Sequence, residues 1–418
     1  MSSRSLLPEY TSSVSGPGSA SRDWLQAIRT RTNFRIGNST VRCQTNFTLT
    51  IMTLGTLTLL LLYTLLPKGM SLFDDHTHYQ NLLKEPAAYN ATYPLTKPIA
   101  LDRFAKILKY RIAVVADMDK ESKLLNDTWV SKLKTGWLKF DRTFNTVEVE
   151  WDSTELLLKG SLSQAGRGME LSELVVFNGR LLTFDDRTGV IYEIEGDKVI
   201  PWVLLNDGDG HATKGFKSEW ATVKDSLLYV GGLGKEWTNS KGEVISYDPQ
   251  WIKVVTPGGR VVHRDWRDNY IRLCSAANIE PPGYMIHEAV NWSPIHQQWF
   301  FLPRRASHEA YDDLKDEERG TNLLLRASQD FQKISLQNVG PKIDSHGFSS
   351  FKFIPGECFI EKKAFRLNTQ ESVAVAIKSE EVKGKAATYI TVFKVKDGQI
   401  LHHETKIGNV KYEGIEFI

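Results

Sequence analysis

The sequence has little cysteine and no strong excess of charge of either sign. Its 418 residues include 3 cysteines, 52 Lys and Arg, and 50 Asp and Glu, giving a formal net charge of +2. So few cysteines exclude a disulfide-rich scaffold. The charge is balanced, and no basic run or ladder of aromatic and arginine residues indicates nucleic-acid binding. The composition is that of an ordinary globular protein.

Runs with helical periodicity are also scarce. Short segments rich in β-branched and aromatic residues take their place, separated by Gly and by Asp-Gly or Asn-Gly pairs. This pattern predicts an all-β domain. One long apolar run, FTLTIMTLGTLTLLLLYTLL at residues 47–66, has no charged residue. Because about 20 apolar residues suffice to cross a bilayer, the run predicts a transmembrane signal anchor rather than a buried core helix.

The charges around this run predict its orientation. Several arginines precede it and acidic residues follow it, so residues 1–46 are expected to form a cytoplasmic tail and the rest of the chain to lie in the lumen. Residues 67–104 have no periodicity and predict a luminal stem, followed by a folded domain at 105–418. In this topology Asn90 and Asn126 are predicted glycosylation sites. The two luminal cysteines, Cys274 and Cys358, allow at most one disulfide.

A loose repeat runs through the folded domain. Each copy has a Glu or small polar residue, then an apolar strand, a short turn and a second strand. The aligned residues are about 45 to 70 positions apart: Glu173, Glu219, Glu288, Ser349 and Glu413. Such spacing is typical of one four-stranded propeller blade per repeat. The alternative is a β-sandwich with an accidental similarity between its strands.

Repeated carboxylates at the heads of inner strands would meet at the propeller axis. Like charges held together must be neutralised, and calcium prefers six to eight oxygen ligands. The pattern therefore predicts a calcium site, whereas no His and Cys cluster has the spacing of a zinc site. The closing stretch KYEGIEFI would supply the strand that completes the ring, with Glu413 as a ligand and Gly414 allowing close backbone approach.

Further charged clusters lie next to the predicted strands. ADMDKES contains Asp117 and Asp119, FDDRTG contains Asp186, and LPRR contains the pair Arg304 and Arg305. Taken singly, each cluster could be a polar turn or a solvated pair. Together with the basic residues of neighbouring loops, they favour hydrolysis of a phosphoanhydride. Cations would hold the phosphates, and a carboxylate would take a proton from water.

These residues carry a resemblance to a known family. The stretches GRGMELSELVVFNG, FDDRTGVIYEIEG, GFKSEWATVKD, LYVGGLGKEW, HEAVNWSP, FLPRR, GFSSFKFIPG and KYEGIEFI resemble the calcium-activated nucleotidase, or apyrase, family. The resemblance covers nearly all of residues 105–418. The N-terminal anchor is similar to that of the vertebrate-type branch of the Golgi and endoplasmic reticulum.

The resemblance implies a five-bladed β-propeller that binds Ca²⁺. It also implies hydrolysis of nucleoside di- and triphosphates to monophosphates, with UDP and GDP preferred over ADP, in support of glycosylation and proteoglycan synthesis. The implied metal ligands are Ser172 (through its carbonyl), Glu173, Glu219, Glu288, Ser349 and Glu413. The implied catalytic residues are Asp117, Asp119, Asp186 and Arg304, with either Asp117 or Asp186 activating water. The expected substrate-binding residues are Lys159, Arg167, Asp185, Arg187, Lys235 and Arg305.

Further expectations concern the assembly of the chain, one long segment and the alternative functions. The family resemblance implies a calcium-promoted homodimer, and the chain could also be released as a soluble form. Residues 367–393 are longer than the family pattern and predict an extended loop in the last blade. The main alternative function is a luminal propeller that binds a partner without catalysis. A lactone or phosphotriester hydrolase fits less well, because such sites rely on Asn, Asp and His around calcium.

Overall fold

The computed structural model describes residues 32–36, 39–43, 52–61, 88–143, 145–239, 243–356 and 371–418. The chain divides into two units, residues 1–82 and 83–418. In the first unit, β1 (Thr32–Ile36) pairs with β2 (Ser39–Cys43), and residues 52–61 form a helix. No helix in the described part of the chain is long and apolar enough to cross a membrane. The flanks of the predicted span, 47–51 and 62–66, lie outside the described residues.

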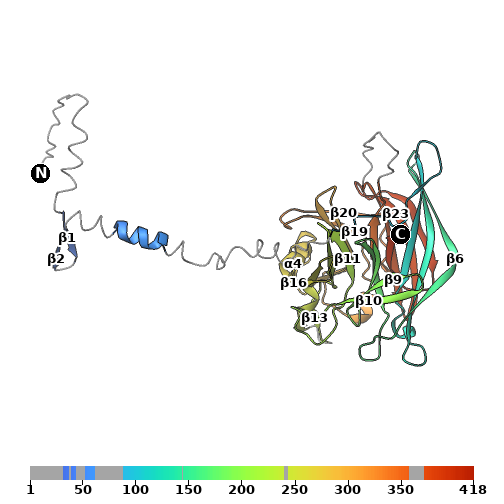
Figure 1. Cartoon of the computed structure of the whole chain (residues 1–418), viewed down its shortest axis with the longest axis horizontal. Helices are drawn as coiled ribbons and strands as arrows, with labels where there is room; N and C mark the ends of the chain where they lie inside the picture. Colours follow the sequence, from blue (N-terminus) through green and yellow to red (C-terminus); the bar gives the residue numbers. More distant parts are fainter. Residues whose placement is uncertain are drawn as a thin grey trace, which may run out of the picture. The chain divides into compact units, whose positions relative to one another are not determined.

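The second unit is built of β-strands, as Figure 1 shows, and the expectation of an all-β domain is confirmed. Its strands form five groups of four. In the first group the C-terminal strand β25 (Tyr412–Phe417) pairs with β4 (Ile107–Ala116). β4 pairs in turn with β5 (Trp129–Asp141), and β5 pairs with β6 (Thr146–Gly160). KYEGIEFI thus forms a strand that pairs with the first long strand of the unit; its role in closing a ring stays a prediction.

The other four groups each follow the chain order, with every strand antiparallel to its neighbour. The second contains β7 (Leu171–Phe177), β8 (Arg180–Asp185), β9 (Val190–Glu195) and β10 (Lys198–Leu204). The third contains β11 (Trp220–Lys224), β12 (Leu227–Gly231), β15 (Trp251–Val255) and β16 (Val261–Asp265). A short hairpin, β13 (Trp237–Thr238) and β14 (Val244–Ser246), interrupts the third group.

The fourth group contains β17 (Tyr284–Ser293), β18 (Gln298–Ser307), β19 (Leu323–Ser328) and β20 (Ile334–Asn338). The fifth contains β21 (His346–Phe353), β22 (Val373–Val382), β23 (Lys385–Lys394) and β24 (Ile400–Gly408). Helical structure in this unit consists, among the described residues, of α4 (Arg267–Ala276), α5 (Asp313–Asp316), η1 (Asp119–Ser122) and η2 (Asp248–Gln250).

The first strands of the five groups contact one another in sequence. β7 contacts β11, β11 contacts β17, β17 contacts β21, and β21 contacts β25, which in turn contacts β7. These strands are the most buried of the unit: all residues of β7, β17, β21 and β25 are buried. Apolar clusters fill the spaces between neighbouring groups, for example between the fifth and the first. Because they are buried on both faces, these strands bury polar side chains such as Glu173, Glu288 and Glu413 together with their apolar ones.

Two segments differ from their sequence expectations. Residues 88–104 were expected to belong to the stem, yet β3 (Ile99–Ala100) pairs with β4, and the Tyr89 ring packs on Phe177 with the ring centroids 5.5 Å apart. The aromatic side chains of this segment explain its attachment, because they bury apolar area against the sheet. Residues 371–393 were expected to extend a loop, but they form β22 and most of β23, whose alternating β-branched residues pair along their whole length.

Candidate functional site

Four of the five first strands depart from regular pairing where the predicted ligands lie, whereas β11 pairs regularly and Glu219 directly precedes it. Pairing passes from His287 to Ala289 and leaves out Glu288, and in the same way it leaves out Ser349 and Glu413 in their strands. Such β-bulges bend the strand, turn a side chain to a new direction, and are frequent next to active sites. In β7 the interruption covers two residues, Ser172 and Glu173. The repeat seen in the sequence is thus a repeated backbone irregularity.

Two of the predicted carboxylates bond one arginine, and a third lies within reach of their charge. Nη1 of Arg304, on β18, donates to Oε2 of Glu288 at 2.6 Å and to Oε1 of Glu413 at 2.7 Å. A single nitrogen therefore joins carboxylates from two different first strands. Glu219 lies buried directly before β11, and the negative charge of Glu288 acts on its carboxyl group.

These carboxylates are not fully compensated. Burial raises the pKa of Glu219 to about 8, although Nζ of Lys217 lies 2.5 Å from its Oε1. Burial also raises the pKa of Glu413 well above its usual range, against the opposing effect of Lys411. Buried carboxyls with raised pKa values favour an added cation. All donors here are oxygen atoms, which suits a hard divalent cation such as Ca²⁺ or Mg²⁺.

The hydroxyl groups of the two bulge serines are already engaged. Oγ of Ser172 donates to the carbonyl of Ser218 at 2.5 Å, and Oγ of Ser349 lies 3.5 Å from the carbonyl of Tyr412. Each bond ties one first strand to the next around the ring. If these serines bind a cation, their backbone carbonyls are the groups to do so, as the resemblance implies for Ser172.

Glu173 lies apart from the other predicted ligands. Its carboxylate accepts hydrogen bonds from Oγ of Ser350 at 2.9 and 3.1 Å and from the amide of Leu174 at 2.8 Å, and Nζ of Lys352 lies 3.3 Å away. Burial raises its pKa to about 8. Its bonds hold β7 to β21, and among the described residues they include no contact with the carboxylates around Arg304.

A second set of predicted residues borders this group. Nζ of Lys411 lies 2.5 Å from Oδ2 of Asp117, 3.1 Å from Oδ2 of Asp119 and 3.6 Å from Oε1 of Glu413. Burial works to raise the pKa of Asp117, but Lys411 more than offsets it, and the pKa is lowered. Asp117 is therefore ionised at neutral pH.

Asp186 links the second set to the first. Its Oδ2 pairs with Lys217, which also pairs with Glu219. Its other oxygen, Oδ1, is buried and accepts no hydrogen bond from the described residues, and Nε of Arg187 lies 3.9 Å from it. A buried acceptor without a partner costs free energy unless a ligand or water satisfies it. This oxygen is therefore available to a bound molecule.

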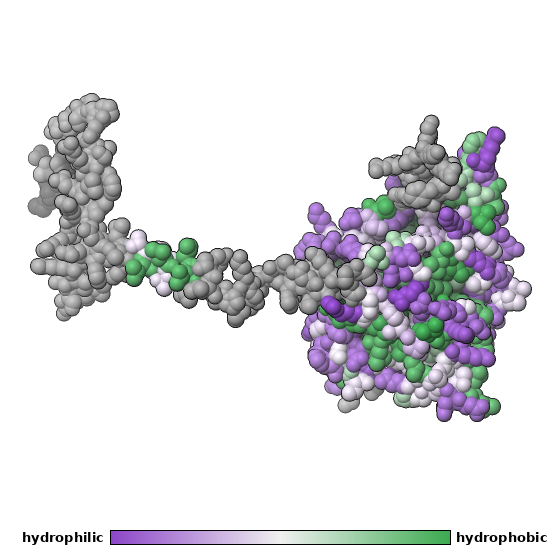
Figure 2. Space-filling view, viewed as in Figure 1, coloured by the Kyte–Doolittle hydropathy of each residue, from purple (hydrophilic) through white to green (hydrophobic). Residues whose placement is uncertain are grey.

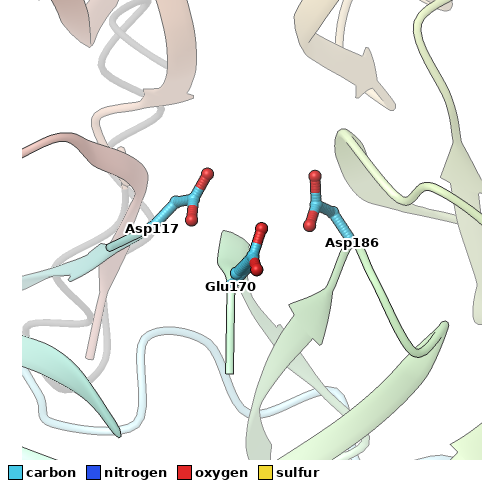
Figure 3. A group of neighbouring side chains, drawn as sticks. All are labelled: Asp117, Glu170 and Asp186. Carbon is cyan, nitrogen blue, oxygen red and sulfur yellow. The ribbon is translucent and has the colours of Figure 1, made fainter. Parts of the chain in front are cut away.

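Glu170 completes a group that the sequence did not predict. One oxygen from each of Asp117, Glu170 and Asp186 lies within 4.8 Å of the others, and Figure 3 shows the three carboxylates converging. Arg167 donates to both oxygens of Glu170, at 2.6 and 2.5 Å, and Nε of Arg187 donates at 2.9 Å. The predicted pair Arg167 and Arg187 thus lies side by side, anchored by one buried acid.

Four predicted substrate-binding residues have no described contact with the carboxylates around Arg304 or with Glu170. Asp185 is fully buried and accepts the amide of Arg187 in its own turn and the amide of Met169 from the segment before β7, and burial raises its pKa to about 6. Arg305 is buried with Nε 3.7 Å from Oδ2 of Asp316, and Lys235 donates to a neighbouring carbonyl at 2.8 Å. Lys159 is exposed near the end of β6. Their roles in substrate binding remain predictions.

The predicted modification sites are exposed. Asn90 and Asn126 both lie at the surface, and Oδ1 of Asn90 accepts the amide of Thr92 at 3.0 Å. Cys274 is a free thiol. Cys358 lies outside the described residues, so the structure does not address a bridge between the two cysteines.

Two further site residues escaped the sequence analysis. Lys411 is the first residue of the closing stretch KYEGIEFI and directly precedes β25, but the sequence analysis gave it no role. Glu381 lies in the segment expected to be a loop, yet it pairs with Nη2 of Arg304 and lies 3.5 Å from Nζ of Lys411. Despite burial, Arg304 and Lys411 lower the pKa of Glu381. The alternation that places Glu381 at the end of β22 is visible in the sequence only if the segment is first recognised as a strand.

Comparison with known proteins places this arrangement in a family. The family model described as Apyrase matches residues 118–418. "Soluble calcium-activated nucleotidase 1" of Rattus norvegicus is 54% identical over 331 residues, which cover 79% of this chain and 78% of that protein. "Apyrase" of Cimex lectularius is 44% identical over 79% of this chain and 87% of its own length. "Apyrase apy-1" of Caenorhabditis elegans is 46% identical over 74% of this chain and 84% of its own.

A solved structure also matches, the β-propeller domain of Nup133 from Vanderwaltozyma polyspora, at a TM-score of 0.27 and 8% identity over 71% of this chain and 90% of that one. A likeness of this size does not establish a shared fold. The sequence relatives and the family model cover most of the chain, and they confirm the prediction of a nucleotide-hydrolysing enzyme: the chain belongs to the apyrase family.

Proposed function

We propose that the chain is a calcium-dependent nucleotidase that converts nucleoside diphosphates and triphosphates to monophosphates and phosphate. The observation that carries the proposal is the buried acidic group in which Arg304 bonds Glu288 and Glu413, with Glu219 close enough for the charge of Glu288 to act on it. Arginine and lysine side chains surround this acidic group and match phosphate oxygens. The names of the rat and mouse relatives, calcium-activated nucleotidases, support the choice of cation.

The residues fit a calcium ion. The carboxylates of Glu219, Glu288 and Glu413 would hold it, with the backbone carbonyls of Ser172 and Ser349. Glu173, also predicted as a ligand, would have to give up its bonds to Ser350 and Leu174 to join them. When bound, the ion supplies Lewis-acid polarisation of a phosphoryl group.

The surrounding residues have separable tasks in this proposal. Arg304 pairs with Glu288 and Glu413. When these carboxylates bind a cation, the guanidinium of Arg304 becomes free to bind phosphate. Arg167 and Arg187, held together by Glu170, present further donors to phosphate oxygens. Asp119 positions Arg167 through a contact of 3.0 Å.

A carboxylate must also take a proton from the attacking water. The two candidates are Asp117 and Asp186. Asp117 is ionised, but its carboxylate already accepts from Lys411 and from the amide of Asp119. Asp186 keeps one oxygen without a donor among the described residues. This difference favours Asp186 as the general base.

The finer parts of the proposal extend beyond the family assignment. We propose that the five strand groups form a five-bladed propeller, supported by the cycle of contacts among their first strands. We also propose a preference for UDP and GDP over ADP and a calcium-promoted homodimer. The uncharged run at 47–66 supports a type II anchor in the Golgi or endoplasmic reticulum, where the enzyme would clear the diphosphates left by glycosyltransferases. Cleavage in the stem would release a soluble form.

Phosphate release tests this function. The full chain would be assayed with UDP, GDP, ADP and UMP in calcium, in magnesium alone and with a chelator. Calcium-dependent release from UDP and GDP, with UMP left intact, is the expected result. A chain that binds calcium and unfolds cooperatively but releases no phosphate from any nucleotide would instead favour the alternative, a binding propeller without catalysis.

A further inference from the structure

A hollow of about 470 Å³ lies beyond the predicted ligands along the first strands. Each of the five strands lines it with the residue three positions after its predicted ligand: Val176, Thr222, Asn291, Lys352 and Glu416. At about 3.3 Å per residue, three positions along a strand correspond to about 10 Å. The first strands therefore have two successive levels, one that carries the predicted ligands and one that lines this hollow.

Lys352 is the one cation among the described residues of this lining, and it is 4% exposed. Lysine is almost never so buried unless it is paired. It is ordinarily a surface residue, and Figure 2 shows hydrophilic residues spread over the visible face of the second unit. Nζ of Lys352 lies 3.3 Å from Oε2 of Glu173 but makes no hydrogen bond with the described residues. The attraction of opposite charges, without a directed bond, thus holds the ammonium group.

The partner of Lys352 is itself a predicted calcium ligand. The carboxylate of Glu173 is held by the hydroxyl of Ser350 at 2.9 and 3.1 Å, and no described bond joins it to the carboxylates around Arg304. A calcium ion bound to those carboxylates and to Glu173 would compete with Lys352 for the same oxygen atoms. It would also be repelled by the charge of Lys352, because like charges a few ångströms apart interact strongly away from bulk water.

The hollow gives Lys352 a place to go when calcium takes Glu173. A water molecule occupies about 30 Å³ in the liquid, so the hollow has room for several. Besides Lys352, polar side chains of Thr222 and Asn291 line it. Water in the hollow can therefore hydrate the ammonium group, and the exchange of partners does not leave an uncompensated buried charge, which would be costly.

We propose that Lys352 competes with calcium for Glu173 and so sets the calcium concentration at which the enzyme becomes active. The inference rests on the proposed calcium-dependent function and names a residue that tunes it. Without calcium, Lys352 and Ser350 hold the Glu173 carboxylate away from the group around Arg304. Calcium draws the carboxylate out of this arrangement, and its affinity is lower than the same ligands would give without the lysine. Lys352 is a positioning residue, since it acts on the ion through Glu173.

Calcium titration calorimetry of the full chain at one fixed pH tests the competition. Lys352→Met keeps the volume of the side chain and removes its charge, and it is expected to lower the Kd for calcium by about tenfold. Thermal unfolding should show a lower midpoint than the wild type in a chelator and a larger rise on adding calcium, because Glu173 then lacks a partner only in the calcium-free state. Ser350→Ala is the smaller change and should lower Kd by about threefold, which keeps the proposal testable if Lys352→Met does not fold.

Lys378→Met is the matched control. Lys378 is also buried in the fifth group, but its partner at 2.6 Å is Glu404, which is not a predicted ligand. This variant should lose stability equally with and without calcium and keep the wild-type Kd.

A double-mutant cycle separates the specific pair from general charge effects. Combined with Glu173→Gln, Lys352→Met should change the Kd by about threefold or less. A Kd that is unchanged or raised in folded Lys352→Met, or an equal effect with and without the Glu173 carboxylate, would overturn the inference. A wild-type chain that binds calcium but hydrolyses no nucleotide would defeat the proposed function and leave the competition standing.

Discussion

The two ends of the closing strand β25 carry buried carboxylates in contrasting environments. At one end Glu413 is an extra residue in a bulge, and its described partners are the long cationic side chains of Arg304 and Lys411. Toward the other end Glu416 lies in regular pairing. It accepts the amides of Val176 at 3.0 Å and Phe417 at 2.8 Å, and the Tyr93 hydroxyl at 2.9 Å.

The difference in hydrogen-bond donors distinguishes a carboxylate that can bind a ligand, Glu413, from one that only stabilises the fold, Glu416. Backbone amides cannot leave Glu416 without disrupting the sheet, so its carboxylate is permanently satisfied. Lysine and arginine side chains can turn away from Glu413 toward a phosphate, and the carboxylate can then bind a metal ion. Burial alone does not tell these two carboxylates apart, since both are nearly inaccessible. The bulge and the kind of donor distinguish them.

Removal of β25 is expected to have the largest effect. Deletion of residues 411–418 takes away the partner of β4, the contacts to β7 and β21, and the core side chains of Tyr412, Ile415 and Phe417. We expect loss of cooperative unfolding, because the cost of several large core side chains exceeds the stability of a typical domain. Thermal unfolding followed by circular dichroism checks this, and a truncated chain that still melts cooperatively would contradict it.

A pair of substitutions three residues apart probes the comparison on β25. Glu413→Gln is expected to lower calcium-dependent kcat by about 100-fold or more, since a ligand carboxylate is lost. Glu416→Gln is expected to keep kcat near the wild-type value but to lower the free energy of unfolding by about 1–3 kcal/mol, because it leaves a buried amide without an acceptor. Kinetics and urea unfolding of both variants give the result. Equal loss of activity in both variants would remove the distinction between the two ends.

Arg304→Lys tests the cation that joins two first strands. A lysine ammonium is a point charge that cannot present the planar fork of arginine donors. We expect kcat/KM for UDP to fall about 30-fold, and the free energy of unfolding to fall by about 1–3 kcal/mol, because a buried carboxylate loses a hydrogen-bond donor although a positive charge is kept. Arg180→Lys, on the exposed side of the second group with its own partner Glu193, is the matched control.

Calcium affinity is expected to depend on pH through Glu219. Burial raises its pKa from 4.5 to about 8, so without a cation the carboxyl is protonated at pH 7, and binding must release that proton. Affinity should therefore rise about tenfold per pH unit between pH 6.5 and 7.5 and level off above about pH 8. The same shift makes the calcium-free fold lose stability as pH rises from 4.5 toward 8, because there the folded state binds more protons than the unfolded state.

Calorimetric titrations at several pH values measure this dependence. Glu219→Gln cannot release this proton, so its weaker calcium binding should depend less steeply on pH than that of the wild type, with Glu413 left as the ligand whose pKa is raised. A wild-type affinity that does not change with pH would show that Glu219 is already ionised before calcium binds.

Glu381→Gln is expected to have the smallest effect. The side chain is about one-third exposed and contacts Arg304 and Lys411 from the outside of the group. Loss of its charge should free Arg304 for phosphate only in part, changing kcat/KM by about threefold or less, since exposed ion pairs contribute little. Steady-state kinetics with UDP provides the test. A loss as large as that of Glu413→Gln would place Glu381 among the essential residues.

Much of this organisation can be read from the sequence. The repeated Glu or Ser before an apolar strand predicts the first strands and a shared site, because a carboxylate is rarely buried without a reason. The bulges appear only in the strand pairing. Contacts between distant loops cannot be read in this way: nothing in the local pattern brings Glu170 to Asp117 and Asp186. Glu173 shows the limit of predicting side-chain direction from strand register. Ser172 and Glu173 are adjacent in one bulge, and the sequence does not tell that the carboxylate of Glu173 bonds Ser350 instead of joining the group around Arg304.

Calcium titration of the wild-type chain, Glu413→Gln and Glu416→Gln tests the central claim most directly. The bulged ends of the first strands are predicted to bind the ion. Glu416→Gln should then bind calcium with the wild-type stoichiometry and affinity, and Glu413→Gln should bind at least about tenfold more weakly. Unchanged binding by a folded Glu413→Gln variant, or equal weakening in both variants, would contradict the assignment of the metal site to this end of the strands.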